Sequence, residues 1–360
     1  MNKLQDEEGE FLKKLGLADL QREYKQEKDG IISKIEREYE TNSQLYENKS
    51  IGIKEDKFHK EVLNAAIFPF VQRGLLPQTL DYVYVRSSPL SERKLKNVDF
   101  LIVSPSKKIA IFGEAKQSVN DPSRIIDEMK QRIAVINTNL DYVEKYITPI
   151  SKIEYVLVVR SFDANNMSKA IARSSANIIL WHVGLQEQKL SIFVPSTSAE
   201  RRASLMHYDD KLNRALSEVS TSTELRTFFP ESHPVTKMEL LTGIDKGRDD
   251  HFTLNEVKSF VKQELDNLSE QEIDIHTKEI IEQAIKINFV RQTEDGNYKI
   301  QSRFKKPSSR YEELKEKWIK YSLEIEKQEK VSSEIKLLKD KLMEKKRTIY
   351  KTLEDFPKED

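Results

Sequence analysis

Two carboxylates and a lysine in one short stretch of the chain have the chemistry needed to hydrolyse a phosphodiester. Asp99 lies in one apolar segment, and Glu114 and Lys116 end the next, with fourteen residues between the two carboxylates. Glu114 and Lys116 are two residues apart, so in a strand they point to the same face. Charged groups at the edge of apolar strands are costly to place unless they pair or hold a metal. Two carboxylates repel each other, and a divalent cation removes that repulsion.

Magnesium is the cation that suits this set. It prefers one or two carboxylates together with waters and a substrate phosphate. A lysine beside the metal can orient and help activate the attacking water, while the metal stabilises charge on the phosphate. We therefore expect Mg²⁺ as the cofactor, with Mn²⁺ able to replace it.

The segments around these residues indicate the order helix, three strands, helix, strand, helix, strand. The turn Pro105-Ser106-Lys107 joins the two central strands, and Pro122 marks the start of the second helix. The expected helices cover residues 57–72, 124–146 and 167–173. The expected strands cover residues 81–86, 98–103, 108–114, 154–159 and 178–183. The buried side of the first helix is expected to carry Phe58, Val62, Ala65, Ala66 and Val71.

Asp99 followed by Glu114-Ala115-Lys116 resembles the D-x(n)-E-x-K core of PD-(D/E)XK nucleases, a superfamily that includes many restriction endonucleases and Holliday-junction resolvases. The core shared by that superfamily (helix, three-stranded meander, helix, strand) is similar to the order predicted for residues 57–160. The resemblance implies that Asp99 and Glu114 are metal ligands and that Lys116 is the catalytic lysine. Val98 stands where the motif has proline, a position that varies widely in this superfamily.

Further site residues follow from the same resemblance. Many members add an acidic residue from the helix before the meander, for which Glu61 is the best-placed match, with Glu55 behind it. Some members use a glutamine after the lysine or in the next helix, and Gln117 and Gln131 are candidates. The implied catalytic residues are Asp99, Glu114, Lys116, Glu61 and Gln117, and the implied metal ligands are Asp99, Glu114 and Glu61. In the alternative interpretation, Glu114 and Lys116 form a solvated ion pair at a strand end, and Asp99 caps a turn.

Composition limits the compartment and the partners. The 360 residues are 38% hydrophobic and 33% charged, so we expect the core to occupy only part of the chain. Sixty basic and sixty acidic residues cancel, so any nucleic-acid surface must be a local patch. There is no cysteine, which excludes disulfides, thiolate zinc sites and cysteine nucleophiles. Without a signal peptide or a membrane-length apolar run, a soluble cytoplasmic protein is expected.

Other common sites have no support in the sequence. The six histidines are scattered and lack HExxH or paired spacing, so we expect no histidine metal site and interpret them as ordinary surface or core residues. Neither GxxxxGK[ST] nor GxGxxG is present, so no nucleotide cofactor is expected.

The pattern divides the chain into four expected regions: a coiled-coil-like helical region at 1–50, a nuclease core at 51–198, a helical, winged-helix-like domain at 199–306 and a long helix at 307–360. The fold class expected for the core is α/β and restriction-endonuclease-like, with a mixed central sheet flanked by helices. In the third region, helices at 254–265 and 277–287 precede a hairpin that turns at Asp295-Gly296.

The two terminal regions carry helical apolar spacing. In the first, Leu17, Leu20, Tyr24, Ile31 and Ile35 recur at three- and four-residue steps, with an interruption expected near Asp29-Gly30 and an end near residues 40–43. In the last, apolar residues from Tyr311 to Ile349 share one heptad register, which predicts a coiled-coil seam. Its partner is either the N-terminal helix, folded back antiparallel, or the same helix of a second chain.

Basic residues suggest where nucleic acid could lie. Arg124, Lys130 and Arg132 follow the catalytic strand, and a second cluster of Arg303, Lys305, Lys306 and Arg310 follows the hairpin. A solvated helix face and a solvated linker explain the two groups equally well.

Together these features predict a Mg²⁺-dependent endonuclease that acts on DNA, expected to be double-stranded, in a restriction or defence setting inferred from family analogy alone. A homodimer is expected because double-strand cleavage needs two active sites. A repair or recombination nuclease is the nearest variant, and RNA remains open as a substrate. The alternative from another class is a non-catalytic scaffold that binds DNA or proteins through the winged helix and coiled coil.

Overall fold

The computed structural model describes residues 21–71, 75–90, 95, 97–145, 149–174, 176–186, 189–193, 209–221, 229–244, 251–264, 268–304 and 306–354. The chain separates into two units. One unit comprises residues 1–51 and 312–360, and the other comprises residues 52–311. The second unit holds all three residues of the predicted D-x(n)-E-x-K motif.

A seven-stranded mixed sheet forms the centre of the larger unit, and the strands follow one another in sequence order across it. The strands are β1 (Val83–Ser87), β2 (Phe100–Ser104), β3 (Ile109–Ala115), β4 (Lys152–Arg160), β5 (Ile179–Gln186), β6 (Lys189–Phe193) and β7 (Ser220–Thr221). The first three form an antiparallel meander, β3, β4 and β5 run parallel, and β6 and β7 return antiparallel. The mixed sheet predicted from sequence is confirmed.

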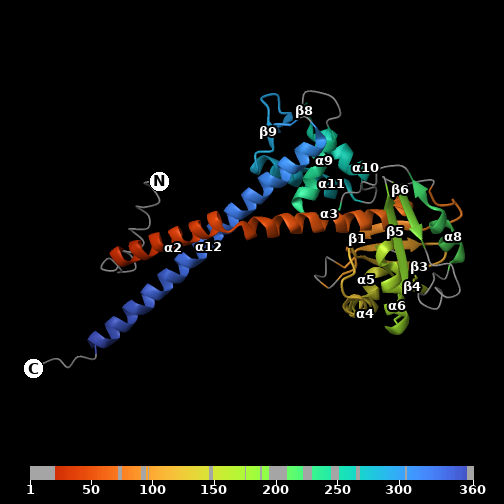
Figure 1. The fold of residues 1–360 in the computed structure, drawn as a ribbon, viewed down its shortest axis with the longest axis horizontal. Coiled ribbons are helices and arrows are strands. Elements are labelled where there is room, and N and C mark those ends of the chain that lie inside the picture. The colour runs from red at the N-terminus through yellow and green to blue at the C-terminus, as the bar shows by residue number, and fades with distance from the viewer. Residues whose placement is uncertain are drawn as a thin grey trace, which may run out of the picture. The chain divides into compact units, whose positions relative to one another are not determined.

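Helices cover both faces of this sheet (Figure 1). Strand side chains alternate between faces, so neighbouring residues enter different cores. Leu101 and Phe112 share a core with residues of α4 (Pro122–Asn137) and α6 (Ala164–Ser174). Phe100 and Ile111 share the opposite core with residues of α3 (Ser43–Val71) and α8 (Asp210–Glu218). The α8–β7 segment thus belongs to this sheet, beyond the boundary expected near residue 198.

Two of the predicted helices differ in extent from the structure. The helix before the meander begins at Ser43 rather than near 57, and Phe58, expected on its buried side, is 37% exposed. The helix expected to continue to 146 ends at Asn137, and a short α5 (Leu140–Val143) follows. Thr138 and Asn139 donate side-chain hydrogen bonds back to the carbonyls of Ala134 (3.1 Å) and Val135 (2.8 Å), which competes with continuation of the helix.

A second, three-stranded antiparallel sheet lies later in the same unit, with the strand order β8-β10-β9. Its elements are α9 (Pro234–Ile244), β8 (His251–Phe252), α10 (Leu254–Glu264), α11 (Glu270–Lys286), β9 (Val290–Gln292) and β10 (Tyr298–Ile300). The predicted hairpin turn is present, with Gly296 at a φ of 82° that favours glycine. α11 begins seven residues before the predicted helix because Ser269 and Glu272 form a capping box there.

The smaller unit is an antiparallel helix pair. α2 (Gln21–Thr41) lies alongside α12 (Pro307–Glu354), and ion pairs join Glu23 to Lys345 (2.5 Å) and Glu38 to Lys330 (2.8 Å) (Figure 1). The partner of the C-terminal seam is therefore the N-terminal helix of the same chain.

The details of the N-terminal helix differ from expectation at one point. α2 continues through Gly30, where an interruption was expected, and ends at Thr41 as predicted. The expected apolar positions Leu17 and Leu20 lie outside the described residues. No helix in the described part of the chain has the length and apolar character needed to cross a membrane.

Candidate active site

The pairing of β2 with β3 brings the two motif carboxylates together. Phe100 pairs with Gly113, so Asp99, immediately before β2, lies opposite Glu114. The backbone N–H of Asp99 donates to the Gly113 carbonyl (2.8 Å), and the backbone N–H of Ala115 donates to Asp99 Oδ2 (2.7 Å). The proximity expected from the hairpin is therefore observed.

Gly113 allows this close pairing because the ring of Phe100 lies across it. A Cβ at position 113 would fall 1.8 Å from Phe100 Cζ, so a side chain would displace the ring. The ring also stacks on Trp181, with centroids 6.2 Å apart. Packing on one face of the sheet thus fixes the register that places the two carboxylates opposite each other.

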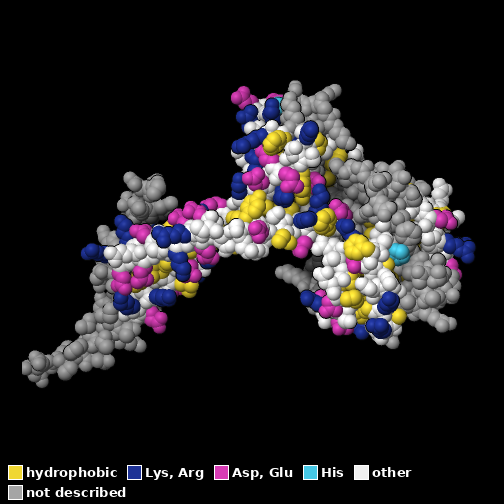
Figure 2. All heavy atoms as spheres, in the orientation of Figure 1, with side chains coloured by type: hydrophobic (Ala, Val, Ile, Leu, Met, Phe, Trp, Pro, Cys, Tyr) yellow, Lys and Arg dark blue, Asp and Glu magenta, His cyan; other side chains and the backbone are white. Residues whose placement is uncertain are grey.

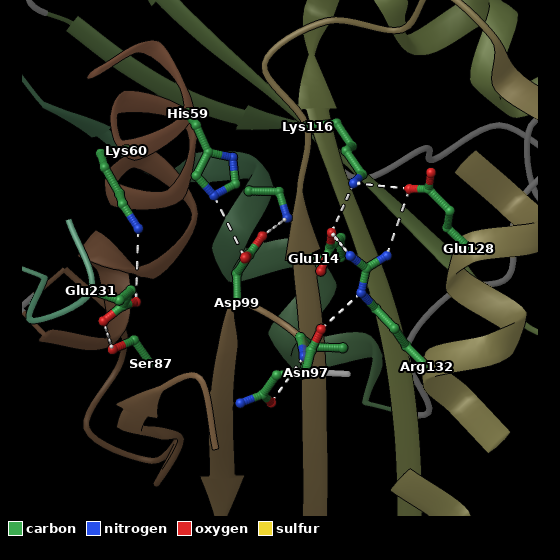
Figure 3. Close-up of polar contacts among 12 residues, drawn as sticks. His59, Lys60, Ser87, Asn97, Asp99, Glu114, Lys116, Glu128, Arg132 and Glu231 are labelled. Carbon is green, nitrogen blue, oxygen red and sulfur yellow. Dashed lines mark hydrogen bonds and ion pairs between the residues drawn. The ribbon is translucent and has the colours of Figure 1, made fainter. Parts of the chain in front are cut away.

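Glu114 is buried and lies between two cationic side chains (Figure 3). It is 3% exposed, and its Oε1 lies 2.9 Å from Lys116 Nζ and 3.1 Å from Arg132 Nη2. Its buried Oε2 has no hydrogen-bond partner among the described residues. Burial and the charge of Asp99 raise the pKa of Glu114 to about 7, against the opposing charges of Lys116 and Arg132. A further cation at Oε2 would favour the ionised carboxylate.

Helix α4 supplies two charged partners from one face. Glu128 and Arg132 are four residues apart, and a helix places such residues side by side. Lys116 Nζ lies 3.4 Å from Glu128 Oε2, and Arg132 Nη1 lies 3.8 Å from the same oxygen. Arg132 also donates from Nε to the backbone carbonyl of Asn97 (2.8 Å). Arg132 therefore connects α4 and Glu114 to the segment that carries Asp99.

Helix α3 approaches Asp99 from the other side (Figure 3). His59 Nε2 lies 3.5 Å from Asp99 Oδ1. Burial alone would raise the pKa of Asp99, but the hydrogen bond and charge of His59 and the N–H of Ala115 hold it below its ordinary value. The next residue, Lys60, is buried and lies 3.8 Å from Glu231 Oε1.

Glu61 makes a different contact from the one the family pattern implies. Its Oε2 lies 3.2 Å from Arg160 Nη2 at the end of β4. Residues two apart on a helix do not face the same way, so Glu61 and His59 cannot both point toward Asp99. Burial raises the pKa of Glu61, and the charges of Arg160 and Lys57 oppose that shift. The role of Glu61 as a metal ligand stays a prediction, and Glu55 is exposed on the same helix.

The two candidate glutamines lie in different surroundings. Gln117 directly follows the motif lysine, and its Oε1 is buried with no hydrogen-bond partner among the described residues. Gln131 is exposed on α4. Gln117 is therefore the better placed of the two, and its catalytic role stays a prediction.

The predicted DNA-contacting residues divide between surface and interior. Arg124 is exposed and lies 3.1 Å from Glu128, while the exposed Lys130 lies 3.8 Å from Asp127. Arg132, grouped with them from sequence, instead faces the carboxylates. In the second cluster Arg303 and Lys306 are exposed and Lys305 lies outside the described residues. Arg310 of that cluster is buried, with its Nε donating to the Phe304 carbonyl (3.3 Å), so it offers no phosphate contact.

Two site residues, His59 and Glu128, were not identified from sequence, and a third, Arg132, was identified only as a candidate DNA contact. The i, i+4 spacing of Glu128 and Arg132 was a usable signal, because it puts both charges on one helix face after the motif strand. His59 had no comparable signal, since only the packing of α3 brings it to Asp99.

The arrangement suits a hard divalent cation that keeps waters. The described residues contain no cluster of three or more His, Asp or Glu side chains that could enclose a metal. Asp99 and the unpartnered oxygen of Glu114 provide two oxygen donors, which is the number magnesium commonly takes from protein beside water and phosphate. These residues fit Mg²⁺ better than a fully protein-enclosed ion. Comparison of the chain with family models, with curated proteins and with solved structures finds no match.

Proposed function

We propose that the chain is a Mg²⁺-dependent endonuclease that hydrolyses DNA phosphodiester bonds at Asp99, Glu114 and Lys116. The observation that carries the proposal is Glu114: a buried carboxylate beside Asp99, with one oxygen held by two cations and the other unpartnered among the described residues. Burying a carboxylate with one unpartnered oxygen is costly, and a cation bound at that oxygen would offset the cost.

The order and direction of the elements support the same assignment. The sequence α3, β1, β2, β3, α4, β4, with β3 parallel to β4, is similar to the helix, meander, helix, strand core of PD-(D/E)XK nucleases. The motif residues lie at the end of the meander, where those nucleases carry theirs. By this resemblance Asp99 and Glu114 hold the metal, and Mn²⁺ replaces Mg²⁺.

The residues divide the work of hydrolysis as follows. A bound Mg²⁺ supplies Lewis acidity at the phosphate. Lys116, held between Glu114 and Glu128, places its ammonium beside the carboxylates and orients the attacking water. Arg132 keeps Glu114 and the Asp99 segment in register, and His59 orients Asp99 through their 3.5 Å contact. The protein thus contributes position and charge more than covalent chemistry.

The second sheet and its helices support a second candidate function. Its order α9, β8, α10, α11, β9, β10 is that of a winged-helix domain. The exposed side chains of α11 include Lys278, Glu282 and Lys286, a mixed charge that suits a protein contact better than a major groove. A non-catalytic scaffold is therefore the second candidate function. In the nuclease, a homodimer would form elsewhere than the α12 seam, because α2 occupies that seam.

Cleavage of supercoiled plasmid by the full chain tests the proposal. We expect nicking or linearisation with Mg²⁺ or Mn²⁺ and none with EDTA. Glu114→Gln and Lys116→Met should each lower the rate by at least about 100-fold, the scale for removing a preorganised charge from an active site.

Matched variants separate catalysis from folding. Glu154→Gln removes another buried carboxylate, on the neighbouring strand β4, and Lys169→Met removes an exposed lysine of α6. Both should cleave like the wild type. Equal loss in Glu114→Gln and Glu154→Gln would contradict the proposal. If the wild type cuts no plasmid, linear, branched or single-stranded DNA or RNA, yet binds DNA unaffected by Glu114→Gln, the scaffold is the better conclusion.

A further inference from the structure

One aromatic side chain near the candidate site is exposed beyond the needs of the fold. Phe162 is 72% exposed, more than any other large apolar side chain that the structure describes. It lies in η3 (Ser161–Asp163), the turn between β4 and α6. Exposing a full aromatic ring to water forfeits hydrophobic stabilisation, so packing within the chain does not account for its position.

This ring lies at the same end of the sheet as the motif residues. The backbone N–H of Lys116 donates to the Val158 carbonyl (2.8 Å), which extends the parallel pairing of β3 and β4 to that end. Two residues after Val158 the strand ends, and Phe162 follows. Burial raises the pKa of Asp163 and the nearby backbone of Val119 opposes that shift, so the loop after Lys116 lies close to the turn carrying Phe162.

The turn holds Phe162 in a fixed place. Asp163 is only 8% exposed, and β4 before the turn is buried along most of its length. The ring therefore stands outward on a segment anchored on both sides. A preorganised aromatic ring loses little conformational entropy when a flat ligand stacks on it.

A cationic side chain ends the strand just before the turn, because Arg160 lies two residues before Phe162. The Arg160 guanidinium lies 5.4 Å from the Phe58 ring centroid, and Phe58 precedes His59, the residue that contacts Asp99. Proteins bind unpaired nucleobases with exposed aromatic rings and nearby cationic groups, because every base has a stacking face and its backbone carries negative charge.

We infer that Phe162 is a stacking platform for an unpaired nucleobase next to the cleavage site. The substrate of the proposed nuclease is then a nucleic acid with at least one base out of its duplex: a single strand, a bulge, or a base displaced on binding. A base paired within an undistorted duplex has both faces covered by its neighbours and cannot occupy the platform. The inference rests on the proposed function for its biological use, but binding tests it without cleavage.

The test measures 2-aminopurine fluorescence, which falls when that base stacks on an aromatic ring. Each probe carries one 2-aminopurine: a single-stranded DNA 20-mer, the same sequence as RNA, a duplex in which that base is unpaired, and a fully paired duplex. All are titrated with the full chain in EDTA. The variants are Phe162→Ala, Phe162→Trp and Phe304→Ala, the last removing another exposed phenylalanine of the same unit, 56% exposed.

The expected result is quenching by wild type and Phe162→Trp, with about tenfold weaker binding and little quenching for Phe162→Ala, the scale for one stacked base. Phe304→Ala should match the wild type. Equal behaviour of Phe162→Ala and Phe304→Ala on every probe overturns the inference, as does equal binding of the fully paired duplex. DNA and RNA arms that differ identify the preferred strand, and either preference supports stacking.

Failure of this inference is distinguishable from failure of the nuclease. Metal-dependent cleavage of a bulged substrate that Phe162→Ala leaves unchanged would refute the platform and leave the nuclease standing. Quenching that depends on Phe162, without cleavage of any substrate, would support the platform and refute the nuclease.

Discussion

The candidate active site and the terminal helix pair both contain ion pairs, but the charges are buried in the first and exposed in the second. At the candidate active site, the Glu114 side chain is 4% exposed and forms ion pairs with Lys116 and Arg132. In the helix pair, Lys330 and Glu38 are each 40% exposed, and positive and negative side chains mix along the surface of α2 and α12 (Figure 2). Placing a charged side chain therefore costs more folding free energy at the candidate active site than in the helix pair.

The difference separates charges that maintain the structure from charges that point to function. An exposed ion pair contributes about 0–1 kcal/mol and is screened by salt, so in the helix pair it mainly favours the antiparallel register. A buried carboxylate requires its partners, and losing one leaves a charge that water cannot reach. The candidate active site keeps such a buried carboxylate despite its cost in folding free energy, which is typical of a functional site.

The largest expected effect on the free energy of unfolding comes from removing a cation from the candidate active site. Arg132→Met leaves Glu114 with one cation and frees the Asn97 carbonyl, so the free energy of unfolding should fall by about 3–5 kcal/mol. Arg124→Met, on the same helix but 77% exposed, should change it by less than about 1 kcal/mol. Urea unfolding of both variants measures this, and equal losses would remove the contrast between buried and exposed charge.

The next effect is the pH dependence of stability that Glu114 contributes. Its pKa is about 7 in the folded chain against an ordinary value of 4.5, so the folded state binds the proton more tightly. Relative to Glu114→Gln, the wild type should therefore lose stability as pH rises from 4.5 to 7, by about 3 kcal/mol in total. Unfolding curves in EDTA between pH 4 and 8 test this. A constant difference between the two proteins would contradict the raised pKa.

The smallest effects are expected in the helix pair. Leu342, buried with Tyr24 and Leu338, should cost about 2 kcal/mol of local stability when changed to alanine, and Lys330→Ala about 0.5 kcal/mol or less. Hydrogen exchange of the α2 amides measures both, and plasmid cleavage should be unchanged in both. Faster exchange in Lys330→Ala than in Leu342→Ala would reverse the order of packing and charge in this unit.

Local patterns in the sequence determined the elements and the motif. Apolar runs and turn residues predicted the order of helices and strands in the core, and the two-residue spacing of Glu114 and Lys116 predicted their shared face. The heptad register of the C-terminal helix predicted its apolar seam. These signals are local, since each depends on periods of two or about 3.6 residues along one segment.

Only the tertiary structure decided which residues surround the motif and which helix fills the seam. Phe58 was expected inside and lies exposed, His59 rather than Glu61 reaches Asp99, and Arg132 turns inward to Glu114. α2 of the same chain pairs with α12. Each of these depends on the rotation and approach of whole elements, which is set by packing between distant segments and leaves no periodic mark in the sequence.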